Sequence, residues 1–137
     1  MVAGYSGTPL IRKLGFKAGH RVWFAGLPDN VHAEIDPDSH GIVMLAAPEP
    51  ALQAAHVFVT DRSELQQHID QLRNILAPDG MIWVSWPKKA AKVVTDVTED
   101  VVRAIALPTG LVDVKVCAID EKWSGLKLVI RKALRTS

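Results

Sequence analysis

The sequence predicts a three-layer α/β fold of the Rossmann-like type, whose mostly parallel sheet ends in an antiparallel C-terminal hairpin. Three observations predict it. Several short runs are almost continuously apolar, which is typical of parallel strands covered on both faces. Helical segments with recognisable capping residues separate the later runs. The C-terminal part instead alternates apolar and polar positions, as the strands of a hairpin do.

Four apolar runs are the expected buried strands, and they span residues 21–25, 42–46, 56–60 and 81–86. A short helix should precede the first strand, because Thr8 is a good N-cap and Pro9 fits the first helical position. Gly15 should end that helix. A second short helix is expected over residues 30–35.

The clearest helix begins after Asp61, which has Glu64 at the spacing of a capping box. Pro78-Asp79-Gly80 should end it in a turn. Asp96 and Glu99 form a similar pair for the next helix. Apolar residues recur at helical spacing in the first of these helices, at Leu65, Ile69, Leu72, Ile75 and Leu76.

The hairpin is predicted from two alternating runs, 112–117 and 126–131, which a polar connector joins. Opposite charges should pair across it. The candidates are Asp113 or Glu121 on one side and Lys127 or Arg131 on the other.

Length and composition predict one Rossmann-like domain over residues 1–137, with a short N-terminal helical arm over about residues 1–19. A formal net charge of +1 argues against a strongly basic nucleic-acid-binding domain. The single cysteine, Cys117, excludes an intrachain disulfide. The N-terminus shows no secretory signal, and no apolar stretch approaches the ~20 residues that span a bilayer. We therefore expect a cytoplasmic protein.

Leu76-Ala77-Pro78-Asp79-Gly80, followed by an apolar strand, a helix and a hairpin, resembles the second half of class I methyltransferases. The resemblance covers residues 55–132. In that family a Leu-x-Pro-Gly-Gly sequence precedes the corresponding strand, and here Asp79 replaces the first glycine. The resemblance implies a Rossmann-like fold and S-adenosylmethionine as the cofactor.

The first half departs from that family's pattern. The loop after the first strand has one glycine, Gly26, where the family has a glycine-rich loop. The second strand ends without a carboxylate for the ribose, since Glu49 lies beyond Ala46-Ala47-Pro48. The chain is also short by about one strand–helix unit. These departures leave the cofactor unknown and disfavour S-adenosylmethionine.

A second resemblance spans nearly the whole chain. Residues 5–15, 82–89 and 123–128 look like those of a small bacterial domain family of unknown function. This resemblance implies the same fold and a cytoplasmic location, and it assigns no catalytic residue.

Ligands of open α/β sheets bind beyond the carboxyl ends of the strands. Trp86 could stack on a planar group there, and Lys88 or Lys89 could pair with phosphate or carboxylate; alternatively, Trp86 only covers the sheet end. Lys88, Lys89 and Lys92 form a basic cluster, which is relevant to ligand binding only if the fold places it at the entrance of a ligand site. The candidate ligand-binding residues are Gly26, Asp29, Thr60, Ser85, Trp86, Lys88, Lys89 and Trp123.

No catalytic residue can be assigned, because no serine has a glycine-flanked elbow; Ser6 before Gly7 comes nearest to one. Cys117 is expected to be a buried or half-buried structural thiol rather than a reactive one. No metal site is predicted. The ligand-type residues His32, Glu34, Asp36, Asp38 and His40 are interpreted as a polar surface loop.

These observations favour a non-catalytic domain that binds a small ligand or serves regulation. The first alternative is a divergent S-adenosylmethionine-dependent methyltransferase-like enzyme. The second is a homo-oligomeric interaction module that uses the exposed edge of the hairpin. No nucleic-acid or membrane partner is expected.

Overall fold

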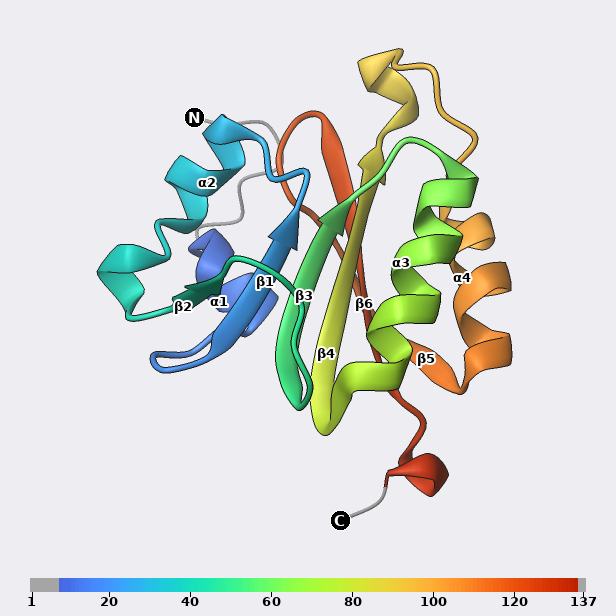
Figure 1. Ribbon diagram of the computed structural model, residues 1–137. Coiled ribbons are helices and arrows are strands. Elements are labelled where there is room, and N and C mark those ends of the chain that lie inside the picture. Colours follow the sequence, from blue (N-terminus) through green and yellow to red (C-terminus); the bar gives the residue numbers. More distant parts are fainter. Residues whose placement is uncertain (1–7, 136–137) are drawn as a thin grey trace.

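The computed structural model describes residues 8–135. A single six-stranded sheet has the order β2-β1-β3-β4-β6-β5 (Figure 1). The first four strands run parallel, and β6 is antiparallel to both of its neighbours, which confirms the predicted fold class. The strands are β1 (Arg21–Ala25), β2 (Val43–Leu45), β3 (Leu52–Phe58), β4 (Leu76–Pro87), β5 (Leu111–Ala118) and β6 (Trp123–Ile130).

Helices cover both faces of the sheet (Figure 1). The α-helices are α1 (Leu10–Leu14), α2 (Asp29–Ile35), α3 (Arg62–Ile75) and α4 (Glu99–Ala106). Short 3-10 helices are η1 (Asp38–His40), η2 (Lys89–Ala91), η3 (Leu107–Thr109) and η4 (Lys132–Leu134). None of the helices in the described part of the chain is long and apolar enough to cross a membrane.

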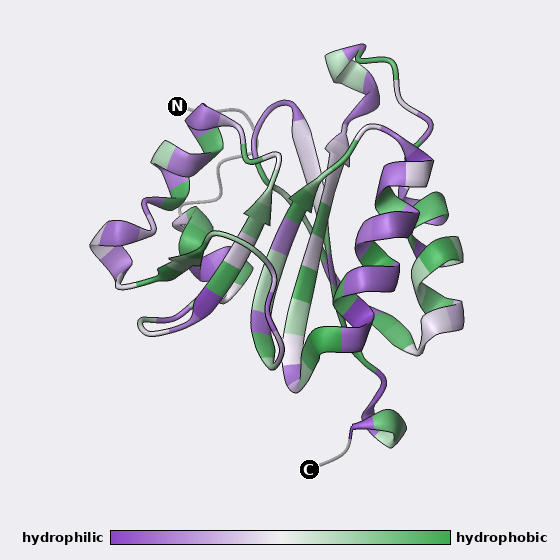
Figure 2. Ribbon diagram, in the orientation of Figure 1, coloured by the Kyte–Doolittle hydropathy of each residue, from purple (hydrophilic) through white to green (hydrophobic). Residues whose placement is uncertain are grey.

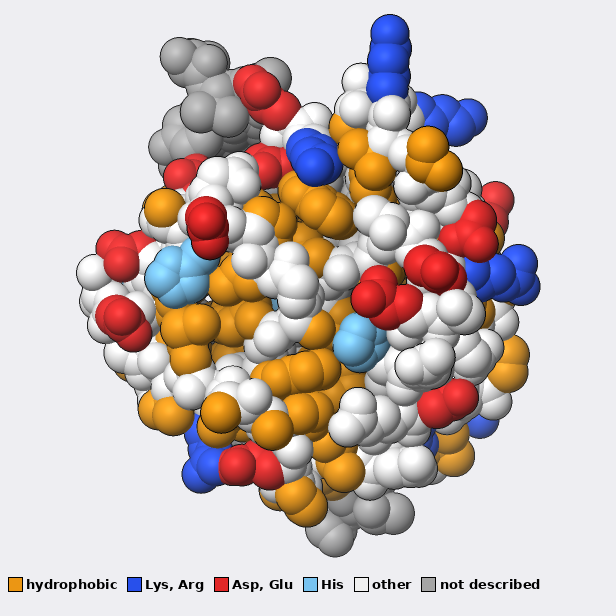
Figure 3. Space-filling model, turned by 45° about the horizontal axis from the view of Figure 1, so that its top comes forward, with side chains coloured by type: hydrophobic (Ala, Val, Ile, Leu, Met, Phe, Trp, Pro, Cys, Tyr) orange, Lys and Arg blue, Asp and Glu red, His pale blue; other side chains and the backbone are white. Residues whose placement is uncertain are grey.

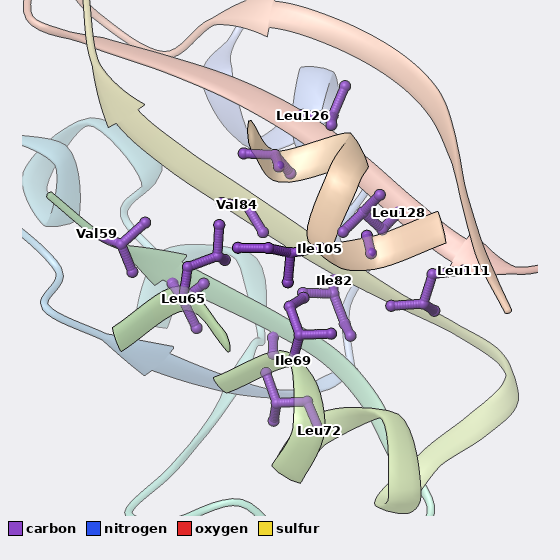
Figure 4. Close-up of a cluster of buried hydrophobic side chains, with 14 of the residues drawn as sticks. Val59, Leu65, Ile69, Leu72, Ile82, Val84, Ile105, Leu111, Leu126 and Leu128 are labelled. Atoms are coloured by element: carbon purple, nitrogen blue, oxygen red, sulfur yellow. The ribbon is translucent and has the colours of Figure 1, made fainter. Parts of the chain in front are cut away.

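The larger core cluster lies between the sheet and the pair α3 and α4 (Figure 4). The strands β3, β4 and β6 contribute side chains to it at every second position. Figure 2 shows hydrophobic residues along the central strands of the sheet. Burying one such leucine or isoleucine contributes about 1.5–3 kcal/mol. Fully buried members include Leu65, Ile69, Leu72, Ile82, Val84, Leu126 and Leu128.

A second cluster fills the opposite face, beneath α1 and α2. Trp83 of β4 is its largest fully buried side chain, and its indole N–H donates a 2.9 Å hydrogen bond to the carbonyl of Leu14. That bond satisfies an otherwise unpaired carbonyl at the C-terminal end of α1. It therefore fixes α1 on the sheet.

The strand order reverses between β1 and β3. The chain leaves β1 towards the β2 edge and then returns to build β3, β4 and the hairpin on the other side of β1. The loops after β1 and β3 therefore depart in opposite directions, which opens a crevice at their carboxyl ends. The fold thus directs attention to Gly26 and Thr60.

Three helix starts test the capping predictions. At α1 the prediction is wrong, because Pro9 is the N-cap, Leu10 is the first helical residue and no side chain caps the helix. Asp61 caps α3 as predicted, since its Oδ1 accepts a 2.7 Å hydrogen bond from the N–H of Ser63. The prediction for α4 is wrong, because Thr98 is the N-cap and accepts from the N–H of Val101. Asp96 accepts instead from the N–H of Arg62 at 2.7 Å. A contact distant in sequence has replaced the local cap.

Other predicted boundaries also differ. The third strand, expected over residues 56–60, begins at Leu52 and ends at Phe58. The expected turn at residues 78–80 is part of β4, because Leu76 already pairs with Leu52 of β3. The second strand, expected over residues 42–46, covers only Val43–Leu45. It is not buried on both faces, since Val43 and Met44 are exposed, because β2 lies at the edge of the sheet.

The hairpin forms as predicted, but its predicted charge pairs do not. Asp113 lies opposite Leu128, and a register shift that begins after it leaves Lys115 opposite Lys127. Glu121 lies in the turn between β5 and β6 and has no strand partner. The extra residue is a bulge, which changes the partner of each position beyond it. Asp113 bonds instead with Arg103 of α4 at 2.9 Å, which lowers the pKa of the Asp113 carboxyl.

Candidate ligand site at the carboxyl edge of the sheet

Gly26 forms the exit from β1 and touches the end of β3. Its backbone is left-handed, with φ of 69°, and a Cβ placed on it would lie 3.0 Å from the carbonyl oxygen of Phe58. A side chain is disfavoured there both by the backbone conformation and by this contact. Gly26 itself is exposed, so its main chain is open to a ligand.

The segment that follows η2 is tied to the end of β3. The Thr95 hydroxyl donates a 2.7 Å hydrogen bond to the carbonyl of Thr60, and the Asp96 N–H donates to the same oxygen. Asp96 also accepts from the N–H of Arg62. Two sets of contacts thus anchor residues 95–96 beside the N-terminus of α3.

Asp120 joins three parts of the edge, and the sequence analysis did not single it out. Its Oδ1 accepts from the N–H groups of Lys122 and Trp123, and its Oδ2 accepts from Asn30 of α2. Its carbonyl accepts a 2.7 Å hydrogen bond from Nζ of Lys88. The sequence could have indicated this role, because Asp120 is the first residue of the polar connector 120–125. An aspartate at the start of a turn commonly accepts a hydrogen bond from the backbone N–H two residues further along the chain.

The two candidate tryptophans are both buried. Trp86 is 7% exposed and belongs to the cluster beneath α3 and α4, so it covers the sheet end from within. Trp123 is 8% exposed and packs edge-to-face on Phe58, with ring centroids 5.3 Å apart. Neither ring offers an open face for a ligand to stack on.

Ser85 pairs with His56, a residue that the sequence analysis did not consider. Nε2 of His56 lies 2.7 Å from Oγ of Ser85, and both residues are fully buried. Burial lowers the pKa of His56 to about 3, so the ring is neutral at physiological pH. The Phe58 ring stacks on the imidazole at 4.2 Å. The sequence feature that could have revealed this pair is a polar residue within each of two apolar strands, His56 in β3 and Ser85 in β4, on the same face of the sheet.

The remaining candidates differ in accessibility. Asp29 begins α2, is exposed and makes no ion pair with another described residue. Lys88 is half-buried against the β5–β6 turn, whereas Lys89 is exposed on η2. The candidates open to a ligand at the carboxyl edge are therefore Gly26, Asp29, Thr60 and Lys89.

The connection from β2 to β3 carries no carboxylate to this edge. Glu49 forms an ion pair with Arg21, the first residue of β1, and therefore lies towards the amino ends of the strands. Ala46 and Ala47, which follow β2 directly, are small and exposed. Figure 1 shows this connection crossing in front of β1.

Two other features lie away from the edge. A surface depression of about 460 Å³ lies beside α1 and is lined by residues that include Arg12, Lys17 and His40. The five ligand-type residues of region 32–40 are spread over α2, its C-terminus and η1. Within residues 8–135, no three histidine, cysteine or acidic side chains gather to hold a metal ion. Ser6 lies outside the described residues.

Comparisons with known proteins identify the fold. A methyltransferase from Aquifex aeolicus that depends on S-adenosylmethionine superposes with a TM-score of 0.60 at 12% identity, covering 93% of this chain and 91% of its own. Magnesium protoporphyrin IX methyltransferase from Synechocystis, with bound S-adenosylmethionine, gives 0.58 at 11% identity, covering 88% and 74%. Fibrillarin from Aeropyrum pernix gives 0.53 at 12%, covering 92% and 70%.

No known family model matches the sequence, and no curated protein matches it. The chain therefore has a methyltransferase-like Rossmann fold at low sequence identity. The expectation of a non-catalytic ligand-binding or regulatory domain is wrong on this finding. Many of the structural neighbours are methyltransferases, and they favour the methyltransferase-like alternative.

Proposed function

We propose that this protein is a divergent S-adenosylmethionine-dependent methyltransferase-like enzyme, with its cofactor at the carboxyl edge between β1 and β3. The supporting observation is the reversal of strand order at that point, followed by the antiparallel β6. In open α/β sheets a nucleotide-sized ligand binds where the order reverses. The neighbours share this arrangement across most of their length.

The residues at the edge fit a nucleoside. Gly26 exposes its main chain at the end of β1, where a Cβ would occupy the space beside Phe58. Ala46 and Ala47 leave room after β2. Asp29 supplies an exposed carboxylate without an ion pair, and carboxylates accept hydrogen bonds from both hydroxyls of a ribose. Asp29 therefore replaces the carboxylate that the end of β2 lacks.

S-adenosylmethionine, when bound, supplies a methyl group on a positively charged sulfur. The residues of this chain position it. Asp29 orients the ribose, and the main chain around Gly26 faces the ligand at the end of β1. The exposed Thr60 presents a hydroxyl at the end of β3. Its carbonyl is already bonded to Thr95, so its backbone is fixed beside the ligand.

Calorimetric titration with S-adenosylmethionine and S-adenosylhomocysteine tests the proposal. Saturable one-to-one binding of both is expected. Asp29→Asn should weaken binding about tenfold, because it removes one charge-assisted hydrogen bond of about 1.5 kcal/mol. Asp38→Asn is the matched control, since Asp38 is an exposed carboxylate on η1 and should bind like the wild type. Lack of binding by the wild-type protein would refute the proposal.

Self-association through β5 is a second candidate function. This eight-residue strand forms one edge of the sheet, and it exposes Val114 at 54% and Val116 at 46%. Exposed strand edges are natural pairing surfaces. Sedimentation should then show a dimer that Val116→Lys converts into a monomer, whereas a monomeric wild-type protein would contradict this candidate.

A further inference from the structure

Four lysines gather where β4 and the β5–β6 turn leave the sheet. Lys88 donates its backbone N–H to the carbonyl of Lys122 at 2.8 Å, so the two segments lie side by side. Lys89 follows on η2, and Lys92 is the residue at its C-terminal end. In Figure 1 this short helix projects above the sheet at the carboxyl end of β4. We call Lys89, Lys92 and Lys122, which are all exposed, the lysine rim.

The lysine rim carries more positive than negative charge, and Nζ of Lys122 lies over the Trp123 ring, 5.5 Å from its centroid. Within the described part of the chain, no lysine of the rim forms an ion pair with a carboxylate. Of the acidic residues close in sequence, Asp120 is committed to Asn30 and the turn, and Asp96 accepts from Arg62. Glu121, next to Lys122, is exposed and forms no ion pair with a described residue. Figure 3 shows basic side chains standing clear of the surface at the top of the view.

The backbone under the rim is held in place from both ends. Nζ of Lys88 donates to the carbonyl of Asp120, and Thr95 and Asp96 bond to Thr60. Between these anchors, Lys92 has a left-handed backbone with φ of 54°. Residues other than glycine adopt this conformation at an energetic cost, and such strain gathers at ligand sites. The backbone positions from which the rim lysines extend are therefore constrained before a ligand binds.

We infer that the lysine rim binds the phosphate or carboxylate groups of a small anionic substrate. The inference rests on the proposed function, because it places this substrate next to the cofactor at the same sheet edge. Ammonium groups bind such anions as point charges. Trp86 and Trp123, the two tryptophans at this edge, are buried and leave no open face on which bases could stack. That argues for a small molecule and against a nucleic acid.

Titration with inorganic pyrophosphate at low ionic strength provides the test. The double variant Lys89→Gln/Lys92→Gln should weaken the binding of pyrophosphate roughly 25-fold. Each lysine in contact with the anion in water should contribute about a fivefold gain in affinity, and the two factors multiply. The matched control is Lys17→Gln/Lys132→Gln, which removes the same charge from two exposed lysines elsewhere. It should change binding by no more than about twofold, because salt screens distant charges.

Three results would overturn the inference. Wild-type protein that fails to bind pyrophosphate at about 1 mM would do so, as would equal weakening in the two double variants. Tighter binding of a single-stranded oligonucleotide than of pyrophosphate, at equal phosphate concentration, would reassign the rim to nucleic acid. S-adenosylmethionine titrated into the same variants separates the two proposals. The rim variants should bind S-adenosylmethionine with wild-type affinity. A failure of S-adenosylmethionine to bind the wild-type protein would refute only the cofactor assignment.

Discussion

Nδ2 of Asn30, at the start of α2, donates a 2.9 Å hydrogen bond to Oδ2 of Asp120 in the turn between β5 and β6. The bond crosses the carboxyl edge, because α2 follows β1 whereas the turn belongs to the hairpin on the far side of β4. The other oxygen of Asp120 holds the turn through Lys122 and Trp123. One carboxylate therefore couples the two halves of the chain at the candidate site.

Replacement of Asp120 by alanine should lower the free energy of unfolding by about 2 kcal/mol, since three side-chain hydrogen bonds disappear together. Asn30→Ala removes only the exposed bond to α2 and should cost at most about 1 kcal/mol. Urea unfolding of both variants provides the comparison. Equal losses would show that the two turn bonds contribute nothing.

Acid should destabilise the protein through His56. Its pKa is about 3 in the folded chain because of burial, and 6.5 is its ordinary value. Between these values the unfolded chain binds a proton that the folded chain does not. Stability therefore falls as the pH decreases below 6.5, by about 1.4 kcal/mol per pH unit. From pH 7 to pH 5 the loss due to His56 should be about 2 kcal/mol.

The double variant His56→Leu/Ser85→Ala isolates this effect, because it removes the titrating ring and leaves no unpaired hydroxyl. Between pH 7 and pH 5 its loss of stability should be about 2 kcal/mol smaller than that of the wild type. A remaining loss is expected from His68, because burial lowers the pKa of that ring too. His32→Leu is the control, since its ring forms no hydrogen bond with a described residue and lies at the surface of α2. A double variant that loses as much stability at pH 5 as the wild type would contradict the role of His56.

Thr95→Val should loosen the segment beneath the lysine rim. The Thr95 hydroxyl bonds to the carbonyl of Thr60 and also accepts from the N–H of Val97, and valine keeps the shape without either bond. Hydrogen exchange at Asp96 and Val97 should accelerate about tenfold, from the loss of roughly 1–1.5 kcal/mol. Ser39→Ala, an exposed hydroxyl on η1, is the control. Unchanged exchange would mean that the segment is held by other contacts.

The fold was predictable because its signals are local. Continuous apolar runs, the Asp61 cap and the alternating hairpin all depend on neighbours within a few residues, and the structure confirms each of them. The charge pairs of the hairpin failed because Asp113 lies opposite Leu128 and bonds to Arg103 of α4, whereas Glu121 lies in the turn outside the paired strands. The sequence contains no equally local sign of this register.

The candidate site was predictable only in part. The position of Gly26 and Thr60 follows from strand ends, which the apolar runs locate. The His56–Ser85 pair and the Asp120 contacts join residues 29 and 90 positions apart, so only the sheet order reveals them. Trp86 shows what the alternation of side chains along a strand cannot predict. Its place in β4 is clear from the sequence, but the face of the sheet on which it is buried depends on where α3 and α4 pack.

A pair of glycine variants separates the cost of backbone conformation from the cost of the close contact at the site. Gly19 and Gly26 both have left-handed backbones, with φ of 86° and 69°. A Cβ on Gly19 would meet nothing within 4 Å, whereas one on Gly26 would lie 3.0 Å from the carbonyl of Phe58. Gly19→Ala should therefore cost about 1 kcal/mol, which is the penalty of the left-handed conformation alone.

Gly26→Ala should cost about 1 kcal/mol more than Gly19→Ala, because a backbone carbonyl in β3 cannot move aside as a flexible side chain can. Chemical unfolding of the two variants under identical conditions gives the difference. Equal costs would show that β3 yields easily at Phe58, and the end of β1 would then be free to separate from β3. A larger cost for Gly26→Ala supports a crevice whose two walls are fixed before any ligand arrives.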